Sequence, residues 1–144
     1  SDDFSIQNAV LTTTANRYPL CIDPQQQAKL WIKRLFQSSN LNVKSLNDRD
    51  FLKHLELAIQ FGYPFLLEDV GEFIDPILDP VFAKNIMTKN NTKIICIGNR
   101  KISFDDSFRL FLCTKSSNPA FSPEIMGKVN IINYCITRDC LAEQ

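Results

Sequence analysis

The stretch LCIDPQQQAKLW, residues 20–31, is the part of the sequence that most clearly indicates the fold. A short apolar run ends at Ile22, six residues follow, and Lys29 then opens a segment whose apolar residues have helical spacing. A strand, a short loop and a helix that opens with a lysine have the layout of a phosphate-binding loop. The stretch therefore raises the question of whether the chain holds a nucleotide here.

The residues of this loop do not suit a phosphate. Against the pattern G-x-x-x-x-G-K-S/T, Asp23 and Ala28 replace the glycines, Leu30 replaces the magnesium ligand, and only Lys29 matches. Glycine is required because the backbone wraps the phosphate with N–H groups and adopts positive φ. Two interpretations remain: a relic of a phosphate loop, or a solvated helix lysine, which the ten lysines of the chain favour.

Apolar runs and amphipathic segments alternate on both sides of this loop. Because continuous apolar strands separated by helices are typical of a parallel sheet covered on both faces, the sequence predicts an α/β fold. Strands are expected at 18–22, 41–46, 64–70, 108–114 and 130–137, and helices at 5–13, 24–37, 48–61 and 122–129. A proline-interrupted, short helix is expected within 74–87, and an inserted hairpin at 93–104 that turns at Gly98-Asn99.

Composition excludes several classes of function. A chain of 144 residues fits one domain with a real core. Its 16 basic residues balance 16 acidic ones, so no charge excess favours a nucleic-acid or membrane surface. No apolar run reaches the roughly 18 residues of a membrane span. We therefore expect neither nucleic acid nor membrane as a partner.

The cysteines and the histidine restrict the chemistry further. Five cysteines, an odd number with no C-x-x-C pair, lie mostly in or beside apolar runs, which favours buried, reduced thiols over a disulfide or zinc framework. His54 is the only histidine, so a His-based triad or a multi-His metal site is excluded. We expect no metal site.

Two further strand ends carry polar residues, where ligands of such sheets bind. Glu68 and Asp69 follow a buried run, as the magnesium aspartate and water-activating glutamate of ATP-hydrolysing enzymes do, but in reversed order. Helix capping or chance explains them equally well. Lys115 and Asn118 follow the run at 108–114 and could sense a γ-phosphate, although Asn118-Pro119 more simply indicates a turn.

Several segments together resemble the fifth AAA+ module of dynein heavy chains. They are SIQNAV, RYPLCIDPQQQAKLWIK, AIQFGYPFLLEDVGEFIDPILDPVF, FRLFLCTKSSNPAFSPEI and KVNIINYCIT, and the likeness runs from about Phe4 to Gln144. The resemblance implies a AAA+ P-loop-type three-layer sandwich with a mainly parallel five-stranded sheet and an inserted β-hairpin. Residues 1–144 are then a single domain, the large subdomain of the module without its helical lid.

The resemblance also implies a function. In this family the fifth module is a structural member of a six-module motor ring: it does not hydrolyse ATP, and it relays motion to the stalk that grips the microtubule. Neighbouring modules of the same heavy chain are its partners, and microtubules are reached indirectly through the parent protein. No cofactor is expected on this fragment, whereas the parent motor uses Mg-ATP. SPEIMGKVNIINY resembles the axonemal branch, which implies the axoneme of a cilium or flagellum, with the cytoplasm as the alternative.

The resemblance assigns positions but no catalytic residue. Gln26 stands where glycine is frequent in the family, and no arginine finger lies near Gly127-Lys128. The degenerate Walker A position comprises Asp23, Gln26, Ala28, Lys29 and Leu30, the Walker B position Glu68 and Asp69, and the sensor position Lys115 and Asn118.

Two other functions remain open. One is an ATP-binding AAA+ subdomain that keeps weak nucleotide binding through Lys29 and Glu68. The other is a stand-alone α/β protein-interaction domain. In a ring, a module packs against its neighbours, so we also expect apolar surface patches, with residues 61–65 and Pro76–Phe82 as candidates.

Overall fold

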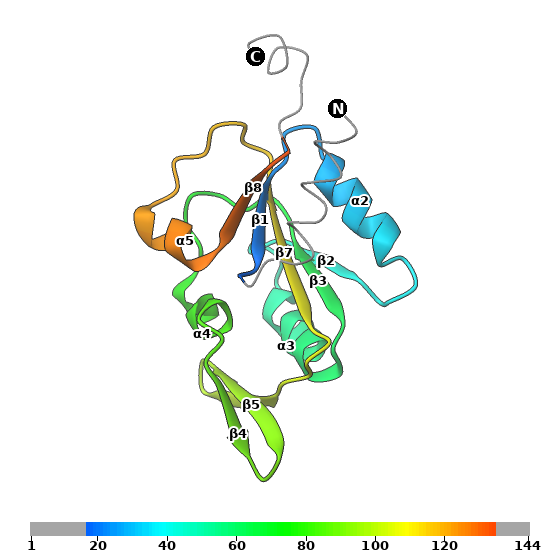
Figure 1. The fold of residues 1–144 in the computed structure, drawn as a ribbon, viewed down its shortest axis with the longest axis vertical. Helices are drawn as coiled ribbons and strands as arrows, with labels where there is room; N and C mark the ends of the chain where they lie inside the picture. The colour runs from blue at the N-terminus through cyan, green and yellow to red at the C-terminus, as the bar shows by residue number, and fades with distance from the viewer. Residues whose placement is uncertain (1–16, 135–144) are drawn as a thin grey trace.

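The computed structural model describes residues 17–134, and a five-stranded parallel sheet forms its centre (Figure 1). The strands are β1 (Pro19–Ile22), β2 (Asn42–Lys44), β3 (Pro64–Leu67), β7 (Arg109–Thr114) and β8 (Asn130–Asn133), in the order β2-β3-β7-β1-β8. The predicted parallel α/β sheet is therefore confirmed. Its three middle strands are almost entirely buried, which explains why their sequences are continuous apolar runs.

Helices cover both faces of this sheet. Helix α2 (Gln27–Leu35) packs Ala28 and Ile32 onto one face, against a smaller core that includes Cys21, Leu66 and Phe111. Helices α3 (Phe51–Phe61) and α4 (Asp79–Phe82) contribute to the larger core on the other face. Because neighbouring residues of a strand point to opposite faces, the two cores share the same strands. The three-layer arrangement is the one that the AAA+ resemblance implies.

The insertion is a three-stranded antiparallel sheet rather than a two-stranded hairpin. Strands β5 (Thr92–Ile97) and β6 (Arg100–Ser103) turn at the predicted Gly98-Asn99, but β4 (Ile86–Lys89) precedes them. The short, proline-interrupted helix expected within 74–87 is present but ends at Phe82, and β4 takes the last residues of that range. Asn90 and Asn91 both adopt positive φ, 55° and 64°, and form the two-residue turn between β4 and β5.

Two further predictions were wrong: the start of the second helix at residue 24 and the apolar surface patch at Pro76–Phe82. Helix α2 begins at Gln27, three residues after Pro24 and the start of the predicted range 24–37, and its apolar residue Leu35 is 49% exposed. A 3-10 turn, η1 (Pro76–Leu78), precedes α4, and Leu78, Val81 and Phe82 are buried. The stretch Pro76–Phe82 is therefore core rather than an apolar surface patch. In residues 61–65, only Phe61 is highly exposed, at 53%, and it stacks on Tyr63.

The last helix and the ends of the chain complete the comparison. Helix α5 (Pro123–Lys128) begins as predicted, with the Ser122 hydroxyl accepting from the Ile125 N–H at 3.3 Å. The helix expected at 5–13, and the part of the last strand beyond Tyr134, lie outside the described residues. Within residues 17–134, no helix has the length and apolar character needed to cross a membrane.

The C-terminal end of α3 is fixed to the segment that enters β7. Gly62 adopts φ 74° and ends the helix, as the sequence predicts, and the Tyr63 N–H donates to the Ala58 carbonyl at 2.9 Å. The Asp105 N–H donates to the Ile59 carbonyl at 3.0 Å, so the loop after β6 is bonded to the same turn. A Cβ atom on Gly62 would lie only 2.6 Å from an Asp105 carboxylate oxygen.

Candidate functional site

The strand order brings three predicted site segments to one edge of the sheet. β7 lies between β1 and β3, so the residues that follow these three strands meet at their carboxyl ends. The Val70 N–H donates to the Cys113 carbonyl, and the Asp23 N–H donates to the Thr114 carbonyl, both at 2.9 Å. The ends of β1 and β3 are therefore both bonded to the end of β7.

The Asp23 side chain binds the N-terminus of α2. Its carboxylate accepts hydrogen bonds from the Ala28 and Lys29 N–H groups at the start of α2, each at 3.0 Å. The residue is only 2% exposed. Backbone N–H groups at a helix N-terminus are the donors that a phosphate loop offers its ligand. In this chain, two of them already bind a carboxylate of the chain itself.

Gln26, in the loop between β1 and α2, adopts a backbone conformation that glycine adopts more readily. It adopts φ 59° and ψ 29°, the left-handed conformation that favours glycine, at the position where the resembling family frequently has glycine. Its N–H donates to the Asp23 carbonyl, and its carbonyl accepts from the Leu30 N–H, each at 3.1 Å. The loop therefore turns through a left-handed residue although that residue is not glycine.

The charged residues of the predicted site form ion pairs with one another. The Lys29 ammonium binds the Glu68 carboxylate, and both side chains are mostly buried, with exposed fractions of 19% and 25%. Lys115 and Asp69 form a second, more exposed pair at 3.2 Å. Each lysine that could meet a phosphate thus neutralises a carboxylate that could meet magnesium. A ligand would have to break these pairs, and the more buried pair would be the harder to break.

Two predicted residues do not join this group. Leu30 is 50% exposed and borders an open hollow of about 270 Å³, lined also by Gln25, Gln26, Lys29 and Lys33. Asn118 donates its backbone N–H to the Ser116 hydroxyl at 3.4 Å, a bond within its own loop. Within residues 17–134, no group of three or more His, Cys, Asp or Glu side chains is placed to hold a metal ion.

Sequence reasoning missed two features of this edge. Thr114 is 3% exposed, and its hydroxyl accepts from the Ser116 N–H at 3.3 Å, which orders the start of the loop that carries Lys115. The capping role of Asp23 was also missed. Its signal was available, because an aspartate a few residues before a helix is a common N-terminal partner.

A pair of thiols lies beneath the site. Cys21 and Cys113 are partners in the register of β1 and β7, and both are buried free thiols. A hydrogen bond with the Cys21 thiol, together with burial, raises the pKa of the Cys113 thiol well above its usual range. The prediction of buried thiols is confirmed for these two, whereas Cys96 is partly exposed, and Cys135 and Cys140 lie outside the described residues.

These thiols should differ strongly in reactivity. We expect Cys96 to react with a thiol reagent in the native protein well before Cys21 and Cys113, because both of the latter are buried and the thiolate is the nucleophile, which the raised pKa of Cys113 makes scarce at that residue. In denaturant all five cysteines should titrate. Mass spectrometry of digested protein after timed labelling identifies the sites. Native labelling of Cys113 as fast as that of Cys96 would contradict the buried pair.

Comparisons with known proteins identify the family. The family described as "ATP-binding dynein motor region" matches residues 1–144. Human dynein axonemal heavy chain 10 is 50% identical over 143 residues, and the Chlamydomonas reinhardtii dynein-1-alpha heavy chain of the flagellar inner arm I1 complex is 51% identical over 145. The match covers 99% and 100% of this chain, but only 3% of each relative. The chain belongs to the ATP-binding dynein motor region family.

Proposed function

We propose that residues 1–144 are the large subdomain, without the helical lid, of the fifth AAA+ module in an axonemal-type dynein heavy chain. In this role the module does not hydrolyse ATP. It relays ring motion between the active modules and the microtubule-binding stalk, so its partners are the neighbouring modules of its own heavy chain. Mg-ATP is used by the parent motor and not by this fragment. The axonemal and flagellar names of the relatives support a place in the axoneme, with the cytoplasm as the alternative.

One observation supports a structural rather than a catalytic role. The Asp23 carboxylate accepts from two N–H groups at the start of α2, while Lys29 is paired with Glu68. A phosphate entering this loop would meet a buried negative charge and a lysine that already has a partner. Repulsion between the two anions and the loss of the ion pair both oppose binding.

A thermal-shift titration with Mg-ATP tests this proposal. A site that kept a Kd of about 10 μM would gain roughly 2.7 kcal/mol of stability at ~1 mM ligand, a Tm increase of several degrees. We expect a Tm shift below about 1 °C, equal with and without magnesium, because a nucleotide that does not bind the folded chain cannot stabilise it. Wild type, Lys29→Ala and Lys33→Ala should behave alike. Lys33 is the matched control, because it lies one turn along the same helix and is exposed.

The alternative function predicts a different pattern. If the chain retains weak nucleotide binding through Lys29 and Glu68, the wild type and Lys33→Ala shift by several degrees in a magnesium-dependent way. Lys29→Ala then shows no shift. That result would overturn the structural role.

A further inference from the structure

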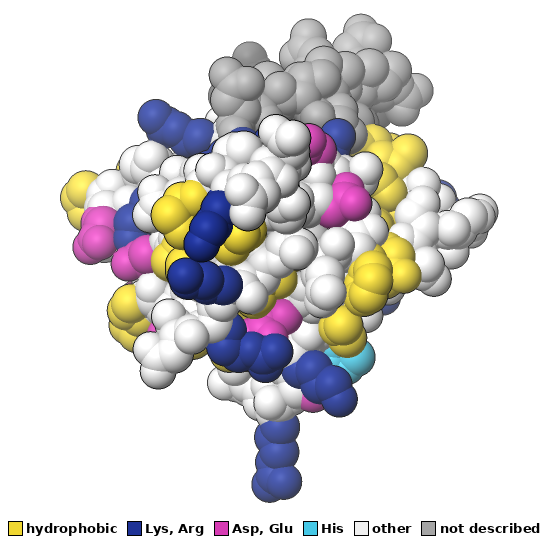
Figure 2. Space-filling view, turned by 90° about the horizontal axis from the view of Figure 1, so that it is seen from below, with side chains coloured by type: hydrophobic (Ala, Val, Ile, Leu, Met, Phe, Trp, Pro, Cys, Tyr) yellow, Lys and Arg dark blue, Asp and Glu magenta, His cyan; other side chains and the backbone are white. Residues whose placement is uncertain are grey.

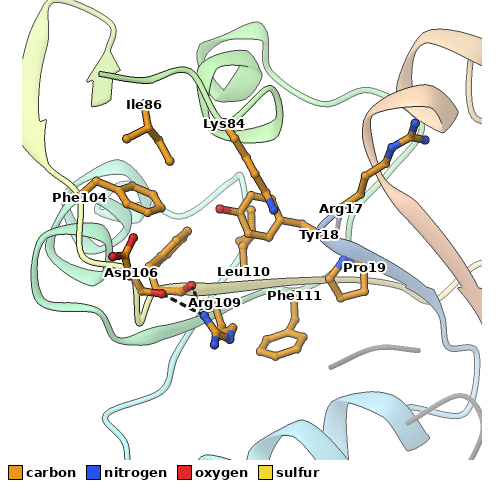
Figure 3. Close-up of a pocket in the computed structure, with 11 residues that line it drawn as sticks. Arg17, Tyr18, Pro19, Lys84, Ile86, Phe104, Asp106, Arg109, Leu110 and Phe111 are labelled. Atoms are coloured by element: carbon orange, nitrogen blue, oxygen red, sulfur yellow. Dashed lines mark hydrogen bonds between the residues drawn. The ribbon is translucent and has the colours of Figure 1, made fainter. Parts of the chain in front are cut away.

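A basic, aromatic pocket lies at the edge of the sheet opposite the candidate site. It has a volume of about 360 Å³ and lies where β1 and β7 begin, with Lys84 and Ile86 contributed from the segment that enters β4. Figure 3 shows the Tyr18 and Phe104 rings in this pocket, with Lys84 extending toward Tyr18 and Arg109 on the β7 side. The Lys84 ammonium lies 4.8 Å from the centre of the Tyr18 ring. We call this cavity the basic pocket.

The charges around the basic pocket favour an anionic occupant. Arg17, Lys84 and Arg109 line it, against Asp106 as the acidic residue. Asp106 is paired with Lys93 at 2.7 Å, whereas the Arg109 guanidinium donates to the Asp106 and Phe108 carbonyls, at 3.2 and 3.1 Å. Figure 2 views the molecule from this side and shows basic side chains beside apolar ones.

The chain carries the complementary surface at its other edge. The loop of residues 69–75 follows β3 and contains Asp69, Glu72 and Asp75, and we call it the acidic loop. Phe73, at its centre, is 72% exposed, the highest value among the large apolar residues of the described chain. Among residues 17–134, Asp69 is the carboxylate of this loop that forms an ion pair. The acidic loop therefore presents a phenyl ring beside Glu72 and Asp75, neither of which forms an ion pair with another described residue, although the Asp75 carboxylate accepts from the Ile77 N–H at 3.0 Å.

We propose that the basic pocket binds the acidic loop of a second copy of this chain. The Phe73 ring enters beside Tyr18 and Phe104, where aromatic rings pack edge to face or offset. Glu72 and Asp75 then lie near the guanidinium groups of the pocket, a geometry that arginine suits because its donors form a fork. The two surfaces lie at opposite edges of one sheet, so this contact is head-to-tail and leaves a free loop and a free pocket at the two ends.

Charge complementarity is the reason for choosing a second copy as the occupant. The chain has no net charge, but basic residues predominate in the lining of the basic pocket and carboxylates in the acidic loop, so two copies aligned head to tail attract at this contact without overall repulsion. The contact is small, with one ring and two carboxylates at its centre. We therefore expect weak association that falls as salt screens the charges.

Analytical ultracentrifugation of designed variants tests the contact. The weight-average mass of the wild type should rise between ~0.05 and ~1 mM protein at ~50 mM salt, and the rise should vanish at ~500 mM salt. Arg109→Glu reverses a positive charge of the basic pocket, and Phe73→Ala removes the aromatic ring of the acidic loop. Each variant alone should therefore remain monomeric. Arg34→Glu, the same charge change on exposed α2 surface, should associate like the wild type.

Mixing the two defective variants gives the sharpest result. The Arg109→Glu protein keeps its loop and the Phe73→Ala protein keeps its pocket, so an equimolar mixture should form dimers and nothing larger. If Arg109→Glu unfolds, Arg17→Glu replaces it. A wild type that stays monomeric at ~1 mM, variants that associate normally, or a mixture that stays monomeric would each overturn the proposal.

Discussion

Replacing Asp23 with alanine is expected to lower the free energy of unfolding by about 2–4 kcal/mol, a fall in Tm of roughly 5–12 °C. The carboxylate accepts two charge-assisted hydrogen bonds at the N-terminus of α2, and Ala28, one of the two donors, is buried. Without Asp23, the Ala28 N–H loses its partner where water is excluded. Urea and thermal denaturation measure the loss.

The control for Asp23 is a carboxylate with a similar bond but no burial. Asp48 accepts from the Ser45 N–H at 2.8 Å and is exposed, so water replaces its bond in Asp48→Ala. We expect that variant to lose less than about 1 kcal/mol. If Asp23→Ala lost no more stability than Asp48→Ala, the carboxylate would not be holding α2 to β1.

Gly62→Ala should also be destabilised by about 2–4 kcal/mol, for a different reason. An alanine at φ 74° is strained, and its Cβ would contact the Asp105 carboxylate at 2.6 Å and the Ser107 Cβ at 2.9 Å. Asp105 cannot easily move away, because its N–H and its carboxylate are both hydrogen bonded, to the Ile59 carbonyl and the Ser107 N–H. Denaturation curves again give the change in stability.

Gly71→Ala is the matched control for this substitution. A Cβ atom added to Gly71 would meet no other atom within 4 Å, and this glycine is not in the left-handed region. We expect its replacement to change stability by no more than about 0.5 kcal/mol. Equal effects of Gly62→Ala and Gly71→Ala would mean that the α3 terminus tolerates a side chain.

Local sequence signals predicted those parts of the fold that local chemistry decides. The continuous apolar run at β3, the glycine that ends α3 and the Ser122 cap of α5 depend on residues close in sequence. Strand β4 was missed because its pairing depends on the Asn90-Asn91 turn. Both residues adopt positive φ, and an Asn-Asn pair signals such a turn less clearly than a pair that contains glycine.

The state of the candidate site depended on contacts that the sequence does not display. Lys29 and Glu68 lie 39 positions apart and meet only because β7 brings the ends of β1 and β3 to the same edge. Aligning the loop with a phosphate-loop pattern assigned a role to each position, but it could not give the direction in which the Asp23 carboxylate points. Likewise, Pro76–Phe82 was expected as an apolar surface patch, whereas tertiary packing buries Leu78 and Val81.

The Asp23 cap has a mechanical consequence for the proposed role. A nucleotide dissociates, so the stiffness of the joint that it stabilises varies with ligand concentration and with each turnover. The Asp23 carboxylate is tethered to the backbone five residues before one of its donors, Ala28, and cannot diffuse away. Its local concentration is therefore fixed. The joint between β1 and α2 should therefore keep one stiffness at every ATP concentration. This suits the proposed role, in which the module transmits force without hydrolysing ATP.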